Sequence, residues 1–205
     1  MFIHPFLKMF NLVFFIILLQ IPQTIAFMSS INYRPNTVKF SRFGEKVYLD
    51  YICGLGDSTK DMECQIPRTG DHLVVGMDPN PIHIKLAQQK YPDLHFIHGN
   101  LPGMRLPKNQ FDMIQMKRAF LTIKNKEQHI KEIYKVLKPK GVLLVVDYSL
   151  DHPYIQELRS VEIPLTQDII NYHPMAHHQL LQHVFDDWTD SWEHEGLCYN
   201  SYVKY

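Results

Sequence analysis

Residues 48–59 read YLDYICGLGDST, and the two closely spaced glycines in this stretch, Gly54 and Gly56, decide how the chain is interpreted. The run before them, Lys46–Asp50, has the apolar character of a β-strand. The Ser-Thr pair at 58–59 is typical of the start of a helix. A strand, a glycine turn and a helix in this order often hold a nucleotide-like cofactor, although a tight turn without a ligand has the same pattern.

Downstream of this turn, short apolar runs alternate with helical patterns. Four further runs predict strands, at His72–Met77, Leu94–His98, Phe111–Met116 and Val142–Val146. Such alternation with fully apolar strands predicts an α/β fold, with a doubly wound, mostly parallel, Rossmann-like sheet and helices on both faces. A ligand of such a fold lies at the carboxyl ends of the strands.

The composition fits one compact domain. The chain has 205 residues, of which 45% are apolar and 20% are charged, as in ordinary globular proteins. Lys and Arg together number 21, as do Asp and Glu, so no basic surplus indicates a nucleic-acid partner. The widely spaced Cys53, Cys64 and Cys198 predict neither a disulfide framework nor a zinc knuckle and fit a reducing compartment.

Histidines near the C-terminus raise the question of a metal site. His173 and His177 have the i, i+4 spacing of one helix face, but Pro174 lies between them. No carboxylate is suitably spaced to join them as a ligand. We therefore predict no metal site.

The N-terminal segment has a different character from the rest of the chain. Residues 9–27 are largely apolar, and their uninterrupted run, Leu12–Leu19, is short for a bilayer span of about 20 residues. Three interpretations are open: a cleaved signal peptide, an uncleaved anchor, or a translated leader before a start at Met28. Basic residues after the segment outnumber Lys8 before it, which keeps the main domain of an anchored chain in the cytosol. We predict a membrane-associated protein of the endomembrane system, with a cytoplasmic or a secreted protein as the alternatives.

Beyond Asp147 the regular alternation ends. Helical spacing of apolar residues is found at Tyr154, Leu158 and Val161 and again at Leu181, Val184, Phe185 and Trp188, and the tail 197–205 suggests one strand. We therefore expect a helical C-terminal cover over 151–205. It would follow a signal or anchor at 1–27, a lead-in at 28–45 and the main α/β domain at 46–150.

Polar residues at the ends of two predicted strands suit a nucleoside. Asp78 ends the second strand, where an acid can accept hydrogen bonds from both ribose hydroxyls. The alternative for Asp78 is a helix N-cap. Gly99 and Asn100 end the third strand, where an amide can face an adenine edge, and the alternative there is an Asx turn.

Together these segments resemble, in order and spacing, the class I S-adenosylmethionine-dependent methyltransferases, of the small-molecule type found in fungi and bacteria. The segments that carry the resemblance are YLDYICGLGDST, VVGMDPNP, FIHGNLPGMRLPKNQFDMIQM and EIYKVLKPKGVLLVVD. They span about Lys46 to Asp147. The most specific piece is LKPKGVLLVVD, a Leu-Lys-Pro turn that leads into the fifth strand.

The resemblance implies S-adenosylmethionine as the cofactor and a set of residues that bind it. Asp50, Gly54 and Gly56 would hold the methionine part, with Cys53 in the same loop. Asp78 would bind the ribose hydroxyls, and Asn100 with Leu101 would flank the adenine. Met116 and Lys117 would line the floor behind the sulfonium.

The chain departs from the family in two places. The family has a glycine at the place of Ile52, and a β-branched residue tolerates the unusual dihedrals of that position poorly. We therefore expect weak but real cofactor binding, with the Ile52 side chain narrowing the pocket. Beyond Asp147 the family adds a strand hairpin, of which the sequence suggests at most one strand.

The function implied by the resemblance is methyl transfer to a small-molecule acceptor by in-line displacement, and the acceptor itself is not predicted. No catalytic residue is identified, and the candidates for a proton acceptor are Asp147, Tyr148 and His152, which follow the fifth strand. One alternative is a non-catalytic binding or scaffold protein with this fold. The other is an NAD-type oxidoreductase, which has Thr59 where its third glycine belongs and leaves the LKPKGVLLVVD segment unexplained.

Overall fold

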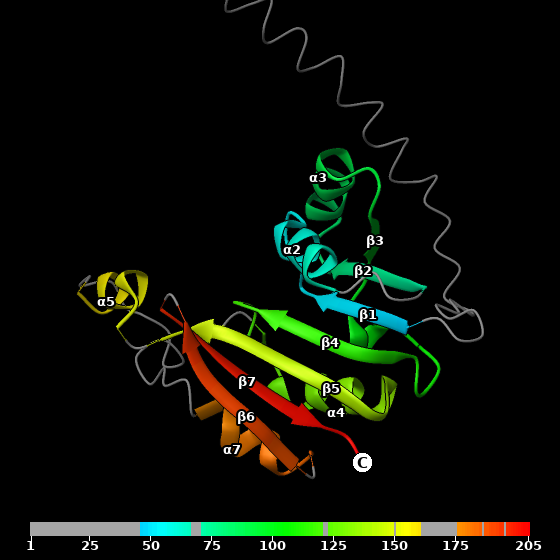
Figure 1. The fold of residues 1–205 in the computed structure, drawn as a ribbon. Helices are drawn as coiled ribbons and strands as arrows, with labels where there is room; N and C mark the ends of the chain where they lie inside the picture. Colours follow the sequence, from blue (N-terminus) through cyan, green and yellow to red (C-terminus); the bar gives the residue numbers. More distant parts are fainter. Residues whose placement is uncertain are drawn as a thin grey trace, which may run out of the picture. The chain divides into compact units, whose positions relative to one another are not determined.

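The computed structural model describes residues 46–66, 71–120, 123–149, 151–160, 176–185, 187–194 and 196–205. These residues form a seven-stranded sheet in the order β3-β2-β1-β4-β5-β7-β6 (Figure 1). The strands are β1 (Lys46–Tyr51), β2 (His72–Asp78), β3 (His95–His98), β4 (Phe111–Lys117), β5 (Leu137–Tyr148), β6 (Asp187–His194) and β7 (Leu197–Val203). Neighbours from β3 to β5 run parallel, and β7 is antiparallel to β5 and β6. The predicted mostly parallel α/β sheet is confirmed.

The sheet changes its direction of growth at β1. From β1 the chain adds β2 and β3 on one side and then returns to add β4 and β5 on the other. The connections that leave β1 and β4 therefore diverge at the carboxyl ends of these strands. In doubly wound folds this is the place where ligands bind.

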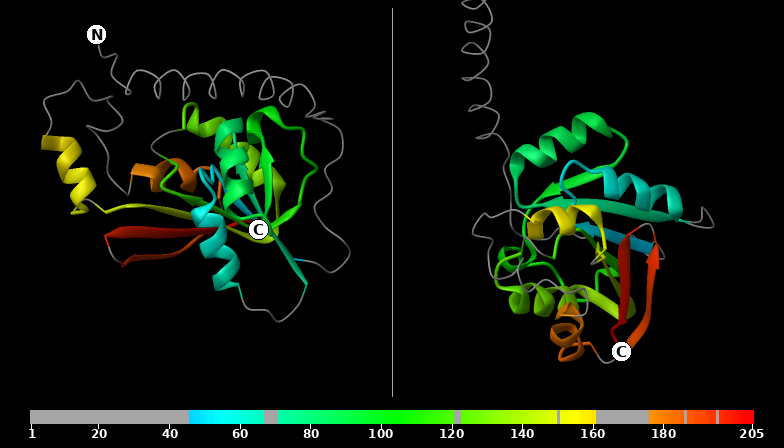
Figure 2. Two further views of the ribbon diagram at one scale, coloured as in Figure 1. Left: turned by 90° about the horizontal axis from the view of Figure 1, so that it is seen from above. Right: turned by 90° about the vertical axis from the view of Figure 1, so that its left-hand side faces the viewer.

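Helices cover both faces of the sheet. In the views of Figure 1 and Figure 2, α2 (Asp57–Gln65) and α3 (Pro81–Lys90) lie on one side, and α4 (Lys126–Val136) and α7 (Ala176–Gln182) lie on the other. The 3-10 helix η1 (Leu101–Gly103) follows β3, and α5 (Pro153–Ser160) follows β5. Successive residues of a strand point to opposite faces. Tyr51 therefore belongs to the main core with the apolar face of α4, whereas its neighbour Asp50 faces α2.

Phe96 of β3 fixes the position of the first turn relative to β2. A Cβ atom at Gly56 would lie 2.7 Å from Phe96 Cζ, and a Cβ atom at Gly76 would lie 2.6 Å from Phe96 Cδ1. Both positions therefore require glycine. Cys53 and Ala87 belong to the same small cluster beneath α3.

The C-terminal part of the chain differs from the prediction. Its last two strands, β6 and β7, form an antiparallel hairpin that extends the sheet beside β5. The helical cover predicted for 151–205 is therefore wrong at β6, whereas the single strand predicted for the tail 197–205 is confirmed as β7. α5 lies where the first of two helices was expected. The second was expected from Leu181, Val184, Phe185 and Trp188, but α7 ends at Gln182 and contains only Leu181 of these, and Trp188 is in β6.

Several predictions concern residues outside the described ranges, namely the segments 1–27 and 28–45 and the His173–Pro174 pair. No helix among the described residues is both long and apolar enough to cross a membrane. The described residues therefore give the predicted membrane-associated location no support, and we withdraw that prediction. Within the same residues, no group of three or more His, Cys, Asp or Glu side chains is placed to hold a metal ion.

Candidate functional site

The turn after β1 contains three residues in the left-handed conformation. Ile52, Gly54 and Gly56 have φ angles of 63°, 55° and 87°. The backbone N–H groups of Ile52 and Cys53 both donate to the Met77 carbonyl, at 2.7 and 3.0 Å, and tie the turn to the end of β2. Ile52 therefore adopts the backbone conformation of a glycine, which costs a residue with a Cβ atom about 1–2 kcal/mol.

Asp78, at the end of β2, holds this turn in place. Its side chain is buried, and its Oδ2 accepts a hydrogen bond from the Gly54 N–H at 2.9 Å. Its Oδ1 accepts from the Asn80 N–H at 2.8 Å and lies 3.1 Å from His83 Nδ1. The helix cap considered for Asp78 is instead Asn80, whose Oδ1 accepts from the Ile82 N–H at 2.9 Å.

The hydrogen bonds of Asp78 do not use all the acceptor positions of its carboxylate. A carboxylate has about four acceptor positions, and Gly54, Asn80 and His83 account for three of them. One acceptor position remains, and a ribose hydroxyl at that position stays a prediction. A second becomes free if the His83 side chain, which is 43% exposed, turns toward solvent.

Asp50 is fully buried beneath α2. Its Oδ2 accepts from the hydroxyls of Ser58 and Thr59 at 2.6 and 2.7 Å, and its Oδ1 accepts from Gln115 Nε2 at 3.4 Å. Burial raises the pKa of the Asp50 carboxyl, and the hydrogen bonds from the two hydroxyls act in the opposite direction. Asp50 thus connects the start of α2 to β1 and β4, and its contact with the methionine part of a cofactor stays a prediction.

Four more of the predicted cofactor residues make contacts elsewhere in the protein. The Cys53 side chain packs beneath α3, and burial raises the pKa of its thiol. Leu101 and Met116 belong to the main core. Lys117 forms an ion pair with Asp61 of α2 at 3.0 Å. Their cofactor roles also stay predictions.

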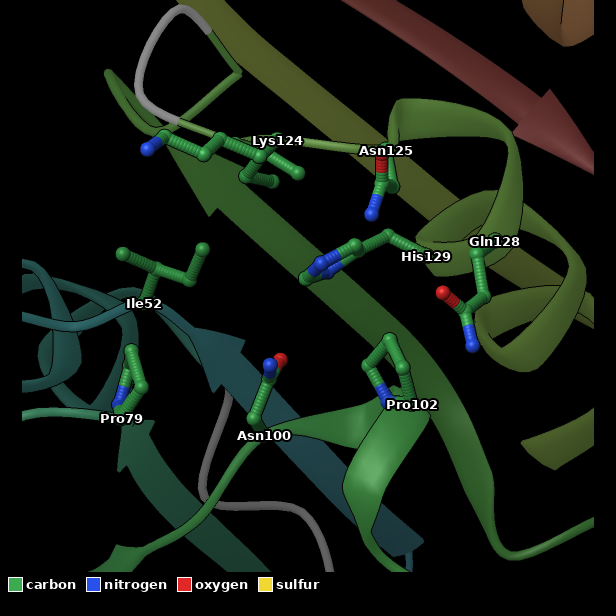
Figure 3. Close-up of a pocket in the computed structure, with 9 residues that line it drawn as sticks. Ile52, Pro79, Asn100, Pro102, Lys124, Asn125, Gln128 and His129 are labelled. Carbon is green, nitrogen blue, oxygen red and sulfur yellow. The ribbon is translucent and has the colours of Figure 1, made fainter.

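A pocket of about 320 Å³ opens beside the turn (Figure 3). The ends of β1, β2 and β3 and the start of α4 supply its lining, which consists of Ile52, Pro79, Asn100, Pro102, Ile123, Lys124, Asn125, Gln128 and His129. The volume is at the lower end of the range for small-molecule sites. Asn100 is the one predicted cofactor residue in this lining, as far as the described residues show. Ile52, the departure from the glycine pattern, lines the pocket as well.

Two residues that the sequence analysis did not single out, Tyr51 and His129, meet at the pocket, where His129 is in the lining and the buried Tyr51 lies behind it. The Tyr51 hydroxyl lies 2.5 Å from Asn100 Oδ1 and 2.7 Å from His129 Nδ1, and it accepts from the Leu101 N–H at 3.3 Å. Burial raises the pKa of Tyr51 and lowers that of His129, so both side chains are neutral at neutral pH. A tyrosine at a core position of β1 is the signal that could have found this cluster, because a buried hydroxyl needs a partner.

The candidates for a proton acceptor lie at the end of β5, apart from the lining of the pocket. Asp147 is buried, and its Oδ1 accepts from the Tyr148 N–H at 3.2 Å. The rings of Tyr148 and His152 are 4.5 Å apart between centroids. His152 Nδ1 accepts from the Tyr154 N–H at 3.1 Å and so supports the first turn of α5. The three are close neighbours, and a catalytic role for them stays a prediction.

Comparisons with known proteins point to one family. The family described as "Methyltransferase domain" matches residues 49–145. A demethylmenaquinone methyltransferase from Listeria welshimeri is 33% identical over 132 residues, which are 61% of this chain and 55% of that protein. A ubiquinone/menaquinone biosynthesis C-methyltransferase from Hydrogenovibrio crunogenus is 30% identical over 109 residues, which are 50% of this chain and 42% of that protein. The chain spans about half the length of the curated relatives it matches.

Solved structures show the same fold. A SAM-dependent methyltransferase from Aquifex aeolicus has a TM-score of 0.62 at 16% identity, over 77% of this chain and 81% of that one. A TehB-like SAM-dependent methyltransferase from Corynebacterium glutamicum has a TM-score of 0.56 at 16% identity, over 78% and 80%. These matches favour neither the NAD-type oxidoreductase nor the non-catalytic alternative. With the strand order and the turn after β1, they confirm, for residues 49–145, the resemblance to the class I S-adenosylmethionine-dependent methyltransferases.

Proposed function

We propose that the chain binds S-adenosylmethionine in the pocket beside the β1 turn and transfers its methyl group to a small-molecule acceptor. The observation that supports this most is the turn itself. Its left-handed residues bring the backbone N–H of Gly54 to the Asp78 carboxylate at the switch point of the sheet. In this proposal residues 46–150 form the cofactor-binding domain.

The residues of the site fit the parts of this cofactor. Among the described residues, apart from Gly54 and its two chain neighbours, no heavy atom lies within 4 Å of the place where a Cβ of Gly54 would be, so a ligand has room to approach the backbone there. Asp78 keeps an acceptor position for a ribose hydroxyl, and Asn100 lines the pocket with an amide that suits a base. Ile52 occupies space that a glycine would leave to the methionine part, and we therefore expect weak binding.

The chemistry asks the chain mainly to position two molecules. When bound, S-adenosylmethionine supplies a methyl group that its positively charged sulfur has already activated. Holding an acceptor in line with such a group contributes up to roughly 7–11 kcal/mol in favourable cases. A proton acceptor is needed only for an acceptor atom that must lose a proton, and we assign this role to the neighbourhood of Asp147, Tyr148 and His152.

The names of the curated relatives suggest the class of acceptor. They are named for demethylmenaquinone and for ubiquinone/menaquinone biosynthesis. We propose a hydroxylated aromatic ring of the quinone-precursor type as the acceptor of this chain. Such a ring is electron-rich, and removal of a hydroxyl proton makes it a better nucleophile toward a methyl group.

Calorimetric titration of the full chain with S-adenosylhomocysteine and with NADH tests the cofactor. We expect binding of the first and none of the second, and the absence of S-adenosylhomocysteine binding would refute the proposal. Transfer of a radiolabelled methyl group to a demethylated quinol then tests the activity. Binding without transfer to any quinol or simple phenol would support the non-catalytic alternative.

A further inference from the structure

The Tyr51 hydroxyl is the centre of a hydrogen-bonded cluster behind the pocket. It lies within hydrogen-bonding distance of the Asn100 amide, the His129 imidazole and the Leu101 N–H. Tyr51 is fully buried, whereas Asn100 and His129 stand in front of it in the pocket lining. Leu101 was expected to flank the adenine, and its N–H already has a partner in Tyr51.

Counting protons fixes what this cluster offers to a ligand. A tyrosine hydroxyl donates one hydrogen bond and accepts two, and the Leu101 N–H takes one of the acceptor positions. Of Asn100 and His129, one must therefore accept from Tyr51 and the other must donate to it. In one arrangement Asn100 Oδ1 accepts and His129 Nδ1–H donates, which leaves the Asn100 N–H groups and the bare His129 Nε2 for the pocket. Reversing both bonds leaves the Asn100 oxygen and a His129 N–H. Either way, the pair presents one donor and one acceptor.

We propose that His129, together with Asn100, recognises the base edge of the cofactor, and that Tyr51 is the positioning residue that keeps the two complementary. The adenine edge carries the N6 amino group as a donor next to N1 as an acceptor, which matches one acceptor and one donor on the protein. This inference rests on the proposed function, because it specifies the base-recognition part of the same site. It adds His129 and Tyr51 to the residues expected from the sequence.

The surroundings of the pair suit a flat base. In Figure 3 the His129 ring extends from α4 toward the space between Ile52 and Asn100. The apolar part of the lining also includes Pro79, Pro102 and Ile123, which can cover the faces of a planar ring. Pro79 directly follows Asp78, the proposed ribose residue. A nucleoside held by Asp78 would therefore place its base next to this wall.

The test is a cycle between protein and ligand atoms, measured by calorimetry on the full chain. The ligands are S-adenosylhomocysteine, its 6-deamino analogue, which lacks the N6 group, and its 1-deaza analogue, which lacks N1. The proteins are the parent, His129→Phe, which keeps a ring without nitrogen atoms, and Lys131→Ala as the matched control. Lys131 is on the same helix, and its side chain is 68% exposed.

We expect the parent to bind each analogue about tenfold more weakly than S-adenosylhomocysteine, which corresponds to the loss of one hydrogen bond. His129→Phe should bind S-adenosylhomocysteine about tenfold more weakly than the parent and should no longer discriminate against one of the two analogues. Lys131→Ala should behave as the parent. If His129→Phe keeps both discriminations, His129 does not contact the base and the inference is overturned. A loss of methyl transfer with unchanged affinities would overturn it too, because His129 would then act on the acceptor.

Tyr51→Phe tests the positioning role. With His129 labelled by ¹⁵N, the parent should show one fixed tautomer of the imidazole, whereas Tyr51→Phe should show a mixture and about tenfold weaker discrimination between the ligands. A purely structural tyrosine would leave the tautomer unchanged, and that result refutes its positioning role. Circular dichroism confirms that the variant folds, and the His129→Phe cycle decides the inference if it does not. If the parent does not bind S-adenosylhomocysteine at all, the proposed function is refuted. If the parent binds it and His129→Phe keeps both discriminations, only the role of His129 in base recognition is refuted.

Discussion

Replacing Ile52 by glycine and, separately, by alanine distinguishes backbone strain from crowding of the pocket. Both substitutions remove the same half-buried side chain, but only glycine removes the cost of a left-handed backbone at φ 63°. That cost is about 1–2 kcal/mol, and the extra chain entropy of glycine offsets about 0.5–1 kcal/mol of the gain. We therefore expect Ile52→Gly to be about 1 kcal/mol more stable to unfolding than Ile52→Ala.

The same two variants should change cofactor affinity in parallel. The Ile52 side chain lines the pocket, so shortening it gives the methionine part more room in both variants. Relief of such crowding is worth about 1–3 kcal/mol, or roughly five- to hundred-fold in the dissociation constant for S-adenosylhomocysteine. Urea unfolding followed by circular dichroism measures the stabilities, and calorimetric titration measures the affinities.

Two results would refute this reasoning. Equal stability of the two variants would mean that the strain at residue 52 is no larger than the entropy cost of glycine, about 0.5–1 kcal/mol. A parent that binds S-adenosylhomocysteine as tightly as both variants would mean that the Ile52 side chain does not face the cofactor. Improved binding in Ile52→Gly alone would assign the effect to the backbone of the turn instead.

Three further predictions concern the residues around this turn. Asp78→Asn should weaken S-adenosylhomocysteine binding by about 1.5–3 kcal/mol, the scale of a hydrogen bond to a charged group, and unchanged affinity in calorimetry would remove the ribose role. Burial raises the pKa of Asp50 above its ordinary 3.8, so the stability linked to this group is present at low pH and is lost as the pH rises through the raised value. The unfolding free energy of the parent minus that of Asp50→Asn should therefore increase as the pH is lowered from about 7, and a constant difference would contradict a raised pKa. Gly56→Ala should lose about 2–4 kcal/mol of stability, because its Cβ would lie 2.7 Å from Phe96. Gly54→Ala has open space around its Cβ and should lose only about 1–2 kcal/mol, from its left-handed backbone. Equal losses of the two variants in urea unfolding would contradict the packing of Gly56 against Phe96.

The strands of the parallel sheet were predictable because strands buried on both faces are continuous apolar runs. The predictions at His72–Met77 and Phe111–Met116 each stop one residue before the observed end of β2 and β4. β6 was not predictable in this way. Its tryptophans, Trp188 and Trp192, are four residues apart with polar residues between them, a spacing that fits a helix face as well as a strand.

The site was only partly predictable, because a position at a strand end does not fix where a side chain points. Asp50 ends the expected first strand and Cys53 belongs to the expected loop, yet both side chains are buried on the side of the sheet that α2 and α3 cover. The contact between Tyr51 and His129 joins residues 78 positions apart. No pattern in a single sequence brings such a pair together, and only the packing of α4 on β1 does.

The isoleucine in the turn shows why fold and cofactor affinity have to be measured separately. Ile52 is partly buried and packs against the main core, and burying about half of an isoleucine side chain stabilises the fold by roughly 1 kcal/mol. That gain is of the same size as the cost of its left-handed backbone, about 1–2 kcal/mol, so the fold loses little by having isoleucine at this position. The same side chain lines the pocket, and the remaining cost therefore falls on the ligand. The similarity of fold to solved methyltransferases does not reflect the cost that the Ile52 side chain imposes on ligand binding, whereas the affinity for S-adenosylhomocysteine depends on that cost directly.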